Sequence, residues 1–236
     1  MTRLAPKQEV DQRKPILGKT RQRNENAAFV TSRARVLDPE LAKQLIQDRQ
    51  SRGIDLYDEV WEGVYVMPPM PNLRHQRIVR RVSTVFDGTL VEEGLAEVYP
   101  GANVSDRRTN WQTNYRVPDV VVVLKNSQAI DCGTHLFGGP DFLVEIQSPG
   151  DDTEEKLLFY RDLRVREVLV IHRDQKHLRL FRHDGNQLVL VQATTFRGKK
   201  WLVSEVIPFA FRRVSAKSGA RVEIQRTDGK PGSWTV

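Results

Sequence analysis

The fold is decided by the stretch DFLVEIQSPGDDTEEKLLFYRDLRVREVLVIHRD, residues 141–174. Its first part, DFLVEIQSP (141–149), is a short apolar run of the kind expected of a buried strand, and REVLVIHRD (166–174) is a second. Between these runs, Asp152 and Glu155 stand three residues apart in a capping-box pattern, which marks the start of a helix. The stretch therefore predicts strand, helix and strand in succession.

A third apolar run lies upstream of this stretch. VPDVVVVL (117–124) is short and β-branched, which is typical of a strand buried on both faces. The connection NSQAIDCGTHLFGGP (126–140) is rich in turn formers, so we expect a hairpin or a short excursion between neighbouring strands. Neighbouring strands would bring the polar residues of the two runs together.

Two carboxylates fall inside these apolar runs. Asp119 opens the first run, and Glu145 is flanked by Val144 and Ile146 in the second. The desolvation free energy of an isolated buried carboxylate is larger than the free energy gained from a packing contact. A buried carboxylate is therefore normally paired with a cation or bound to a metal. Side chains alternate along a strand, which puts Gln147 on the same face as Glu145.

The expected helix, over about 153–163, carries a lysine in an unusual place. At about 100° per residue, Lys156 falls near the middle of the apolar arc rather than on the solvent side. The arc consists of Leu157, Phe159, Tyr160 and Leu163. Lys156 therefore needs an anionic partner, and the carboxylates of the preceding strands are the candidates. The alternative is that its stem packs while its ammonium reaches water.

Flanking segments predict further elements. Asp38 and Pro39 begin a helix that ends near Gly53, and Asn72 caps a long helix that stops at Gly94. Alternating residues predict strands and hairpins elsewhere. These are a hairpin over 56–67, short strands over 96–104 and 112–117, and a hairpin over 177–192.

Composition and charge divide the chain into three parts. The apolar fraction of 39% and the charged fraction of 28% are ordinary for a globular protein and exclude a disordered or membrane chain. Residues 1–36 hold nine Lys and Arg against three Asp and Glu, which accounts for +6 of the net charge of +7. We expect a basic, disordered N-terminal arm over 1–36, one domain over 37–212, and a polar C-terminal extension over 213–236. The arm could strengthen binding to phosphate groups, or it could be a solvated tail.

Several sequence features bear on the compartment. No apolar run approaches the length of about 18 residues that a membrane helix needs, and no apolar stretch follows the basic N-terminus as in a secretory signal. The single cysteine, Cys132, can form no internal disulfide, which fits a reducing compartment. We expect a cytoplasmic protein that does not enter a membrane.

Taken together, these motifs resemble a known family. VPDVVVV, DFLVEIQSP, EEKLLFY and REVLVIHRD are similar to the bacterial putative restriction endonuclease family of the PD-(D/E)XK nuclease superfamily. The resemblance covers about residues 56–210 and is strongest over 117–175. The hairpin WEGVYVMPP and a histidine early in the next helix, His75, agree with it.

The resemblance implies a restriction-endonuclease-like α/β fold, with a mixed central sheet flanked by helices. It also implies hydrolysis of phosphodiester bonds in DNA with a divalent metal, Mg²⁺ or Mn²⁺. Asp119 and Glu145 match the metal-binding carboxylates of the motif. The usual lysine two residues after the second carboxylate is Gln147 here, and Lys156 on the helix is the candidate to replace it. Weaker candidates are Glu62, which could reach the metal from the hairpin, and His75, which could contact phosphate.

Two other interpretations stay open at this stage. The altered lysine position also fits a catalytically silent nuclease-like module that binds nucleic acid or a protein partner. A purely structural ion pair between Lys156 and the carboxylates, with function elsewhere, is the third. Since nucleases that cut both strands commonly dimerise, a homodimer is also open.

Overall fold

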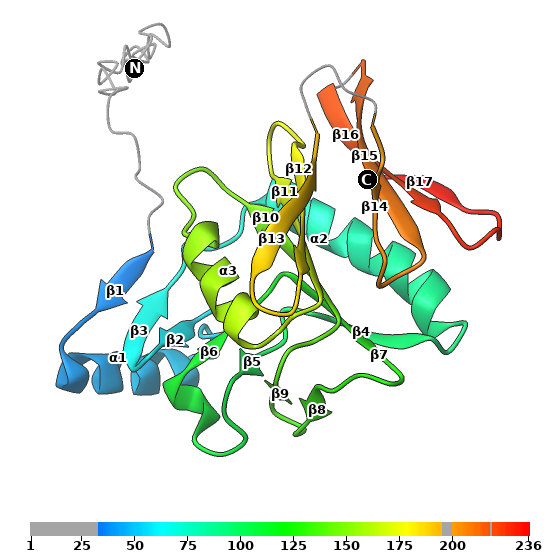
Figure 1. Cartoon of the computed structure of the whole chain (residues 1–236). Coiled ribbons are helices and arrows are strands. Elements are labelled where there is room, and N and C mark those ends of the chain that lie inside the picture. Colours follow the sequence, from blue (N-terminus) through cyan, green and yellow to red (C-terminus); the bar gives the residue numbers. More distant parts are fainter. Residues whose placement is uncertain (1–32, 195–199, 218) are drawn as a thin grey trace, which may run out of the picture. The chain divides into compact units, whose positions relative to one another are not determined.

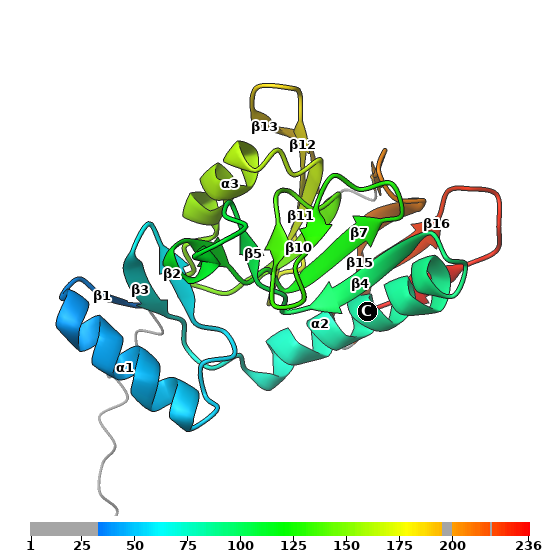
Figure 2. The ribbon, with the colours of Figure 1, turned by 90° about the horizontal axis from the view of Figure 1, so that it is seen from below.

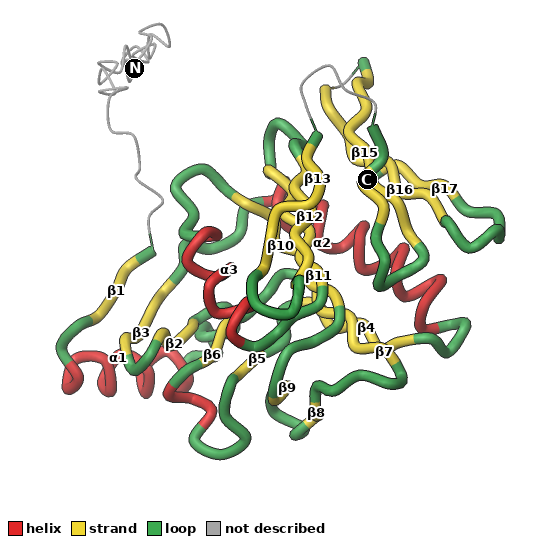
Figure 3. Tube along the Cα trace, in the orientation of Figure 1, coloured by secondary structure: helices red, strands yellow, loops and turns green. Residues whose placement is uncertain are grey.

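The computed structural model describes residues 33–194, 200–217 and 219–236. Most of the expected N-terminal arm, residues 1–32, lies outside the described residues. The described part is a mixed α/β fold with helices at the sides of a central sheet, as expected (Figure 1, Figure 3). Among the described residues, no helix combines the length and the apolar character needed to cross a membrane.

The central sheet has six strands in the order β13-β12-β11-β10-β7-β4. β10 and β11 run parallel, whereas every other neighbouring pair is antiparallel, so the sheet is mixed. The two expected buried strands around the helix and the 117–124 strand all belong to it. The strands are β4 (Ala96–Pro100), β7 (Val120–Leu124), β10 (Phe142–Gln147), β11 (Glu167–His172), β12 (Leu178–His183) and β13 (Leu188–Ala193).

Alternation along β10 sorts its side chains between two apolar layers. Val144 and Ile146 point into a core shared with α2 (Leu73–Phe86) and the C-terminal sheet. Leu143 points into the opposite core, which contains residues of α3 (Thr153–Asp162). Figure 2 shows the two helices on opposite sides of the sheet. Because Glu145 shares the parity of Leu143, it lies on the α3 side.

The start of α2 is fixed by Asn72, as its sequence predicts. The Asn72 side chain accepts hydrogen bonds from the backbone N–H groups of Arg74 and His75, both at 3.0 Å. The helix continues into a π-helical turn, η1 (Asp87–Val91), before Gly94 adopts a left-handed conformation with φ of 64°. The cap therefore sets the position of His75 in the first turn.

The prediction of a capping box at the start of α3 is wrong. The Asp152 side chain makes no capping hydrogen bond. Instead, Arg35 donates to Asp152 at 3.1 Å and to Glu155 at 2.5 Å. The Arg35 guanidinium, 117 residues before Asp152 in the chain, binds both carboxylates in place of the backbone N–H groups of the helix start. The helix itself forms over nearly the expected range.

A second sheet of seven short strands carries the early hairpin. Its order is β1-β3-β2-β6-β5-β9-β8, and α1 (Pro39–Ser51), capped by Asp38 as predicted, packs beside it. The predicted hairpin becomes β2 (Glu59–Trp61) and β3 (Val64–Met67). The remaining strands are β1 (Ala34–Val36), β5 (Val104–Ser105), β6 (Tyr115–Arg116), β8 (Ile130–Asp131) and β9 (Leu136–Phe137).

Two sequence-based boundaries change in this region. The strand expected over 96–104 splits, because β4 joins the central sheet while β5 joins the second sheet. The strand expected over 112–117 is shortened by a 3-10 turn, η2 (Trp111–Thr113). The connection between β7 and β10 is a short excursion, which pairs β8 and β9 with the second sheet.

The polar C-terminal extension expected from residue 213 is instead part of the folded domain. A four-stranded sheet contains β14 (Leu202–Val203), β15 (Phe209–Ala216), β16 (Gly219–Arg226) and β17 (Ser233–Thr235). Val222 and Ile224 of β16 are fully buried in the α2 core. Arg226 also pairs with Glu93, at 2.5 Å, next to the end of η1. The sequence looks polar because one face of this sheet is solvated.

Candidate active site

A pocket of about 150 Å³ lies where residues of β2, β10, α2 and α3 converge. Four of the six sequence-predicted candidates line it: Asp119, Glu145, Lys156 and His75. Its other charged lining residues are Arg33, Glu59, Asp151 and Arg173. The topology thus brings together side chains from positions 33 to 173 of the chain.

Asp119 is held just before β7 by two hydrogen bonds. Its Oδ2 accepts from the backbone N–H of Ile146 on β10 at 2.7 Å, and its Oδ1 lies 2.7 Å from Nε2 of His75. Burial alone would lower the pKa of His75, but its hydrogen bond to Asp119 and the Asp119 charge raise it above its usual value. His75 therefore orients Asp119 with a charged or readily charged imidazole.

Glu145 sits on the α3 face of β10 and is almost completely buried. Its Oε1 lies 3.1 Å from the Lys156 ammonium and also accepts a hydrogen bond from the Tyr160 hydroxyl. Burial raises the pKa of Glu145 to about 7; Lys156 acts against this rise, while the neighbouring Asp119 charge adds to it. The carboxylate is thus paired with a cation, while the charge of Asp119 is close enough to act on its pKa.

Lys156 points into the core side of α3, as its helical phase predicts. Its side chain is 3% exposed, so the alternative in which the ammonium reaches water is wrong. Nζ lies 2.8 Å from Glu59, 3.1 Å from Glu145 and 3.3 Å from the carbonyl oxygen of Val117. Burial would lower the pKa of Lys156, but the two carboxylates outweigh burial and raise it. The ammonium is charged and its three protons have three acceptors.

Sequence reasoning missed Glu59, which forms the second carboxylate partner of Lys156. It accepts from the indole N–H of Trp61 at 2.7 Å and from the backbone N–H of Val117 at 2.9 Å. Burial would raise the pKa of Glu59, but the charges of Lys156 and Arg33 lower it. The sequence signal for Glu59 was weaker than for Glu145, because Val60 and Trp61 follow it but another carboxylate, Asp58, precedes it.

Arg33 is also part of this site, although the sequence placed it in the disordered arm. Its guanidinium lies 2.8 Å from Asp151 and 3.9 Å from Glu59, and its side chain is 7% exposed. The carboxylates of the folded domain attract this end of the arm and order it. With Arg35 bound to α3, part of the expected positive arm is neutralised within the fold.

Two predicted candidates do not reach the pocket. Gln147 lies on the same face of β10 as Glu145, but its Oε1 accepts from Arg179 at 3.4 Å and it does not line the pocket. Glu62 occupies the exposed turn between β2 and β3, with φ of 49°. The turn directs Glu62 to solvent, so the hairpin contributes Glu59 instead.

Comparison with known proteins matches most of the chain to a family. The model of the family named Uma2 and described as "Putative restriction endonuclease" matches residues 45–216. The chain belongs to the Uma2 family. The family expected from the sequence motifs is thereby confirmed, and it places the chain among nuclease-like proteins.

A solved structure is also similar to this Uma2 chain. It is a crystal structure described as a putative nuclease belonging to DUF820 from Anabaena variabilis ATCC 29413. The two chains are 16% identical, and the match has a TM-score of 0.49 and covers 62% of this chain and 80% of that chain. No curated protein matches the chain.

The pocket of this Uma2 chain has a donor set suited to a hard cation. Each oxygen of Asp119 accepts one hydrogen bond, and Oε2 of Glu145 accepts only a long one, at 3.3 Å from Lys156. A carboxylate oxygen has two lone pairs, so both groups keep acceptor capacity. Within the described ranges, no three His, Cys, Asp or Glu side chains form a metal-binding group. The set fits Mg²⁺, which uses one or two carboxylates and keeps several waters.

Proposed function

We propose that this protein is a divalent-metal-dependent nuclease that hydrolyses phosphodiester bonds in DNA. The observation that carries the proposal is the convergence of Asp119 and Glu145 on one pocket, with the buried Lys156 beside them. Membership of a family described as "Putative restriction endonuclease" also supports it. In this proposal Asp119 and Glu145 hold Mg²⁺ or Mn²⁺.

The metal, when bound, would lower the pKa of a coordinated water and polarise a phosphoryl oxygen. The residues of the chain provide the rest. Lys156 fixes the Glu145 carboxylate and places a positive charge next to the site, which offsets negative charge developing on a phosphate. His75 and the Ile146 N–H fix the orientation of Asp119 from two sides. Gln147 has no part in this proposal, since it lies outside the pocket.

Metal binding is tested by the melting temperature in the presence of increasing Mg²⁺ or Mn²⁺. A cation that binds only the folded state raises the melting temperature as its concentration exceeds its dissociation constant. We expect a rise in the wild type and in Glu97→Gln, an exposed control on β4, and none in Asp119→Ala. No rise in the wild type at millimolar concentrations would contradict a metal site.

Activity is tested by incubating the wild type with plasmid and single-stranded DNA in Mg²⁺ or Mn²⁺. Asp119→Asn and Glu145→Gln keep the shape of the side chains and remove a metal-binding charge, so we expect each to abolish cleavage. Glu97→Gln should cleave like the wild type. Cleavage that survives both Asp119→Asn and Glu145→Gln would defeat the assignment of these residues.

A second candidate is the nuclease-like module without catalysis. One observation favours it: all three protons of the Lys156 ammonium already have protein acceptors, which suits a structural role. In that case the Mg²⁺-dependent rise in melting temperature or DNA binding would be present while cleavage is absent under all metals. A purely structural ion pair would give neither metal binding nor cleavage.

A further inference from the structure

A second hollow, of about 350 Å³, lies on one flank of α2 and is strongly basic. We call it the basic cleft and define it by its charged lining. These residues are Arg74, Arg77, Arg81, Arg173, Lys176 and Arg221, with Asp174. Residues 37–236 together carry only about +1 of the net charge of +7, so this positive charge is local to the cleft. Six cations therefore meet in one place of a nearly neutral domain.

The helical spacing of three arginines gives the cleft its length. Arg74, Arg77 and Arg81 stand three and four residues apart on α2, so they share one face of the helix. At 1.5 Å per residue, the seven residues from Arg74 to Arg81 span about 10 Å. One strand of duplex DNA carries a phosphate about every 3.4 Å along its axis. The row therefore spans the axial rise of about three nucleotides of one strand.

The carboxylate in the lining is already engaged and leaves a positive surplus. Asp174 lies 2.7 Å from Arg173 and 3.6 Å from Arg74. Burial lowers the pKa of Lys176, and the charges of Arg221, Arg74 and Arg173 lower it further, while Asp174 opposes them. Cations that repel one another at close range are stabilised by a polyanion that enters between them.

The basic cleft adjoins the candidate active site. Arg173 lines both hollows, and its guanidinium also lies 3.4 Å from the Ser148 hydroxyl, which lines the catalytic pocket. His75 of that pocket follows directly after Arg74 of the cleft. A chain of phosphates bound along α2 would therefore lead past Arg173 towards Asp119.

We infer that the basic cleft binds the phosphodiester backbone of DNA on one side of the bond to be cut. This inference rests on the proposed function, since it names the path by which that substrate reaches the pocket. The contacts are to phosphates and carry no base information, so the cleft contributes affinity and position rather than sequence preference. If the cleft has this role, mutation of its arginines should weaken the binding of long DNA and leave the hydrolysis of small phosphodiesters unchanged.

The test is the triple variant Arg74→Gln/Arg77→Gln/Arg81→Gln, which leaves the catalytic pocket intact. Binding of a labelled duplex of about 20 base pairs is measured by fluorescence anisotropy in EDTA, over a range of salt concentrations. Each lost phosphate contact removes about 0.9 from the slope of log K against log salt, so we expect the slope to fall by about 2 to 3 units. Affinity at about 0.1 M salt should fall at least about tenfold.

A second substrate separates the cleft from catalysis. Hydrolysis of bis(p-nitrophenyl) phosphate with Mg²⁺ or Mn²⁺ needs the pocket, but this ester is too short to reach along α2. We expect the triple variant to hydrolyse this ester like the wild type while KM for plasmid DNA rises. The matched control is Lys43→Gln/Arg52→Gln/Lys125→Gln, which removes the same charge from positions outside the cleft.

Four results would overturn the inference. These are DNA affinity equal to that of the wild type, an equal loss in the control variant, loss of ester hydrolysis in the triple variant, and a wild type that does not bind duplex DNA. A wild type that binds DNA through the cleft but cleaves neither substrate would contradict the proposed function and leave the cleft assignment standing.

Discussion

Removal of the Lys156 ammonium gives the sharpest test of how the candidate site is held together. In Lys156→Met the stem is retained and the charge is lost, so Glu59 and Glu145 remain buried without the cation that lies 2.8 and 3.1 Å from them. Loss of one member of a buried ion pair costs about 3–5 kcal/mol. That is a large part of the total stability of about 5–15 kcal/mol of a typical domain.

The penalty should depend on pH, with a sign set by Glu145. Its folded pKa of about 7 lies above the ordinary value of 4.5, so protonation favours the folded state. The contribution of the protonated Glu145 to the free energy of unfolding is complete below pH 4.5 and is lost as pH rises through about 7. Without Lys156, the folded pKa rises further and the loss extends to higher pH. The penalty of Lys156→Met should therefore grow by on the order of 1 kcal/mol between about pH 5.5 and 8.0.

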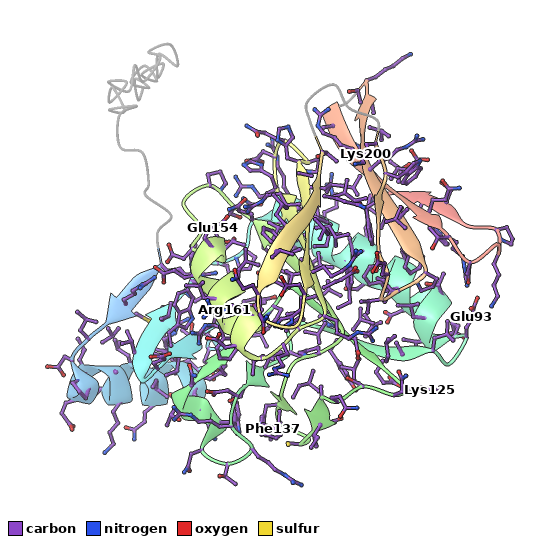
Figure 4. The ribbon with its side chains drawn as sticks, in the orientation of Figure 1. Glu93, Lys125, Phe137, Glu154, Arg161 and Lys200 are labelled. Atoms are coloured by element: carbon purple, nitrogen blue, oxygen red, sulfur yellow. The ribbon has the colours of Figure 1, made fainter. Side chains whose placement is uncertain are left out.

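The assay is urea denaturation followed by tryptophan fluorescence at both pH values. Lys125→Met is the matched control, because Lys125 lies just beyond β7 and away from α3, as Figure 4 shows, and should change stability by less than about 0.5 kcal/mol. Glu145→Gln in the Lys156→Met background should recover part of the loss. A penalty below about 1 kcal/mol at the higher pH, or one that shrinks as pH rises, would refute this account of the pair.

Three further substitutions test neighbouring features. Tyr160→Phe removes a buried hydroxyl donor to Glu145 and should cost about 1–3 kcal/mol in urea denaturation, and an unchanged midpoint would contradict that bond. Gly139→Ala should lower the free energy of unfolding by at least about 1–3 kcal/mol, because the new Cβ would lie 2.2 Å from the backbone oxygen of Leu163. An unchanged melting temperature would show that the loop can move away. His75→Gln removes a group whose raised folded pKa stabilises the fold below about pH 6.5 and loses that effect as pH rises through the folded pKa. The stability difference from wild type should therefore shrink above neutral pH, whereas a difference that grows would rule out the charged pair with Asp119.

The elements around the site are predictable because their patterns are long. β10 and β11 each continue for six residues, and α3 for ten, so parity and helical phase can be read from the sequence. Those two periods are enough to place Glu145 and Lys156 on facing sides of β10 and α3. The contact between them at 3.1 Å is the direct result.

What escaped prediction depends on contacts between distant parts of the chain. β2 has only three residues, all buried, so it offers no alternation from which the direction of Glu59 could be read. Its backbone donor, the N–H of Val117, lies 58 residues away. Arg33 and Arg35 likewise join the fold through carboxylates more than 100 residues later. Local composition alone assigned them to a solvated arm.

Of the two residues that the sequence offered in place of the strand lysine, Lys156 lines the pocket and Gln147 does not. Two residues along a strand cover roughly 7 Å, so a side chain at position 147 follows the strand away from Glu145, and there it meets Arg179. A side chain on α3 instead approaches Glu145 from above the sheet, and from there Lys156 also reaches Glu59 on β2. The positive charge of the site therefore depends on how α3 docks against two different sheets. Any change that loosens this helix should disturb the carboxylates and the fold together, which a lysine on the strand would not do.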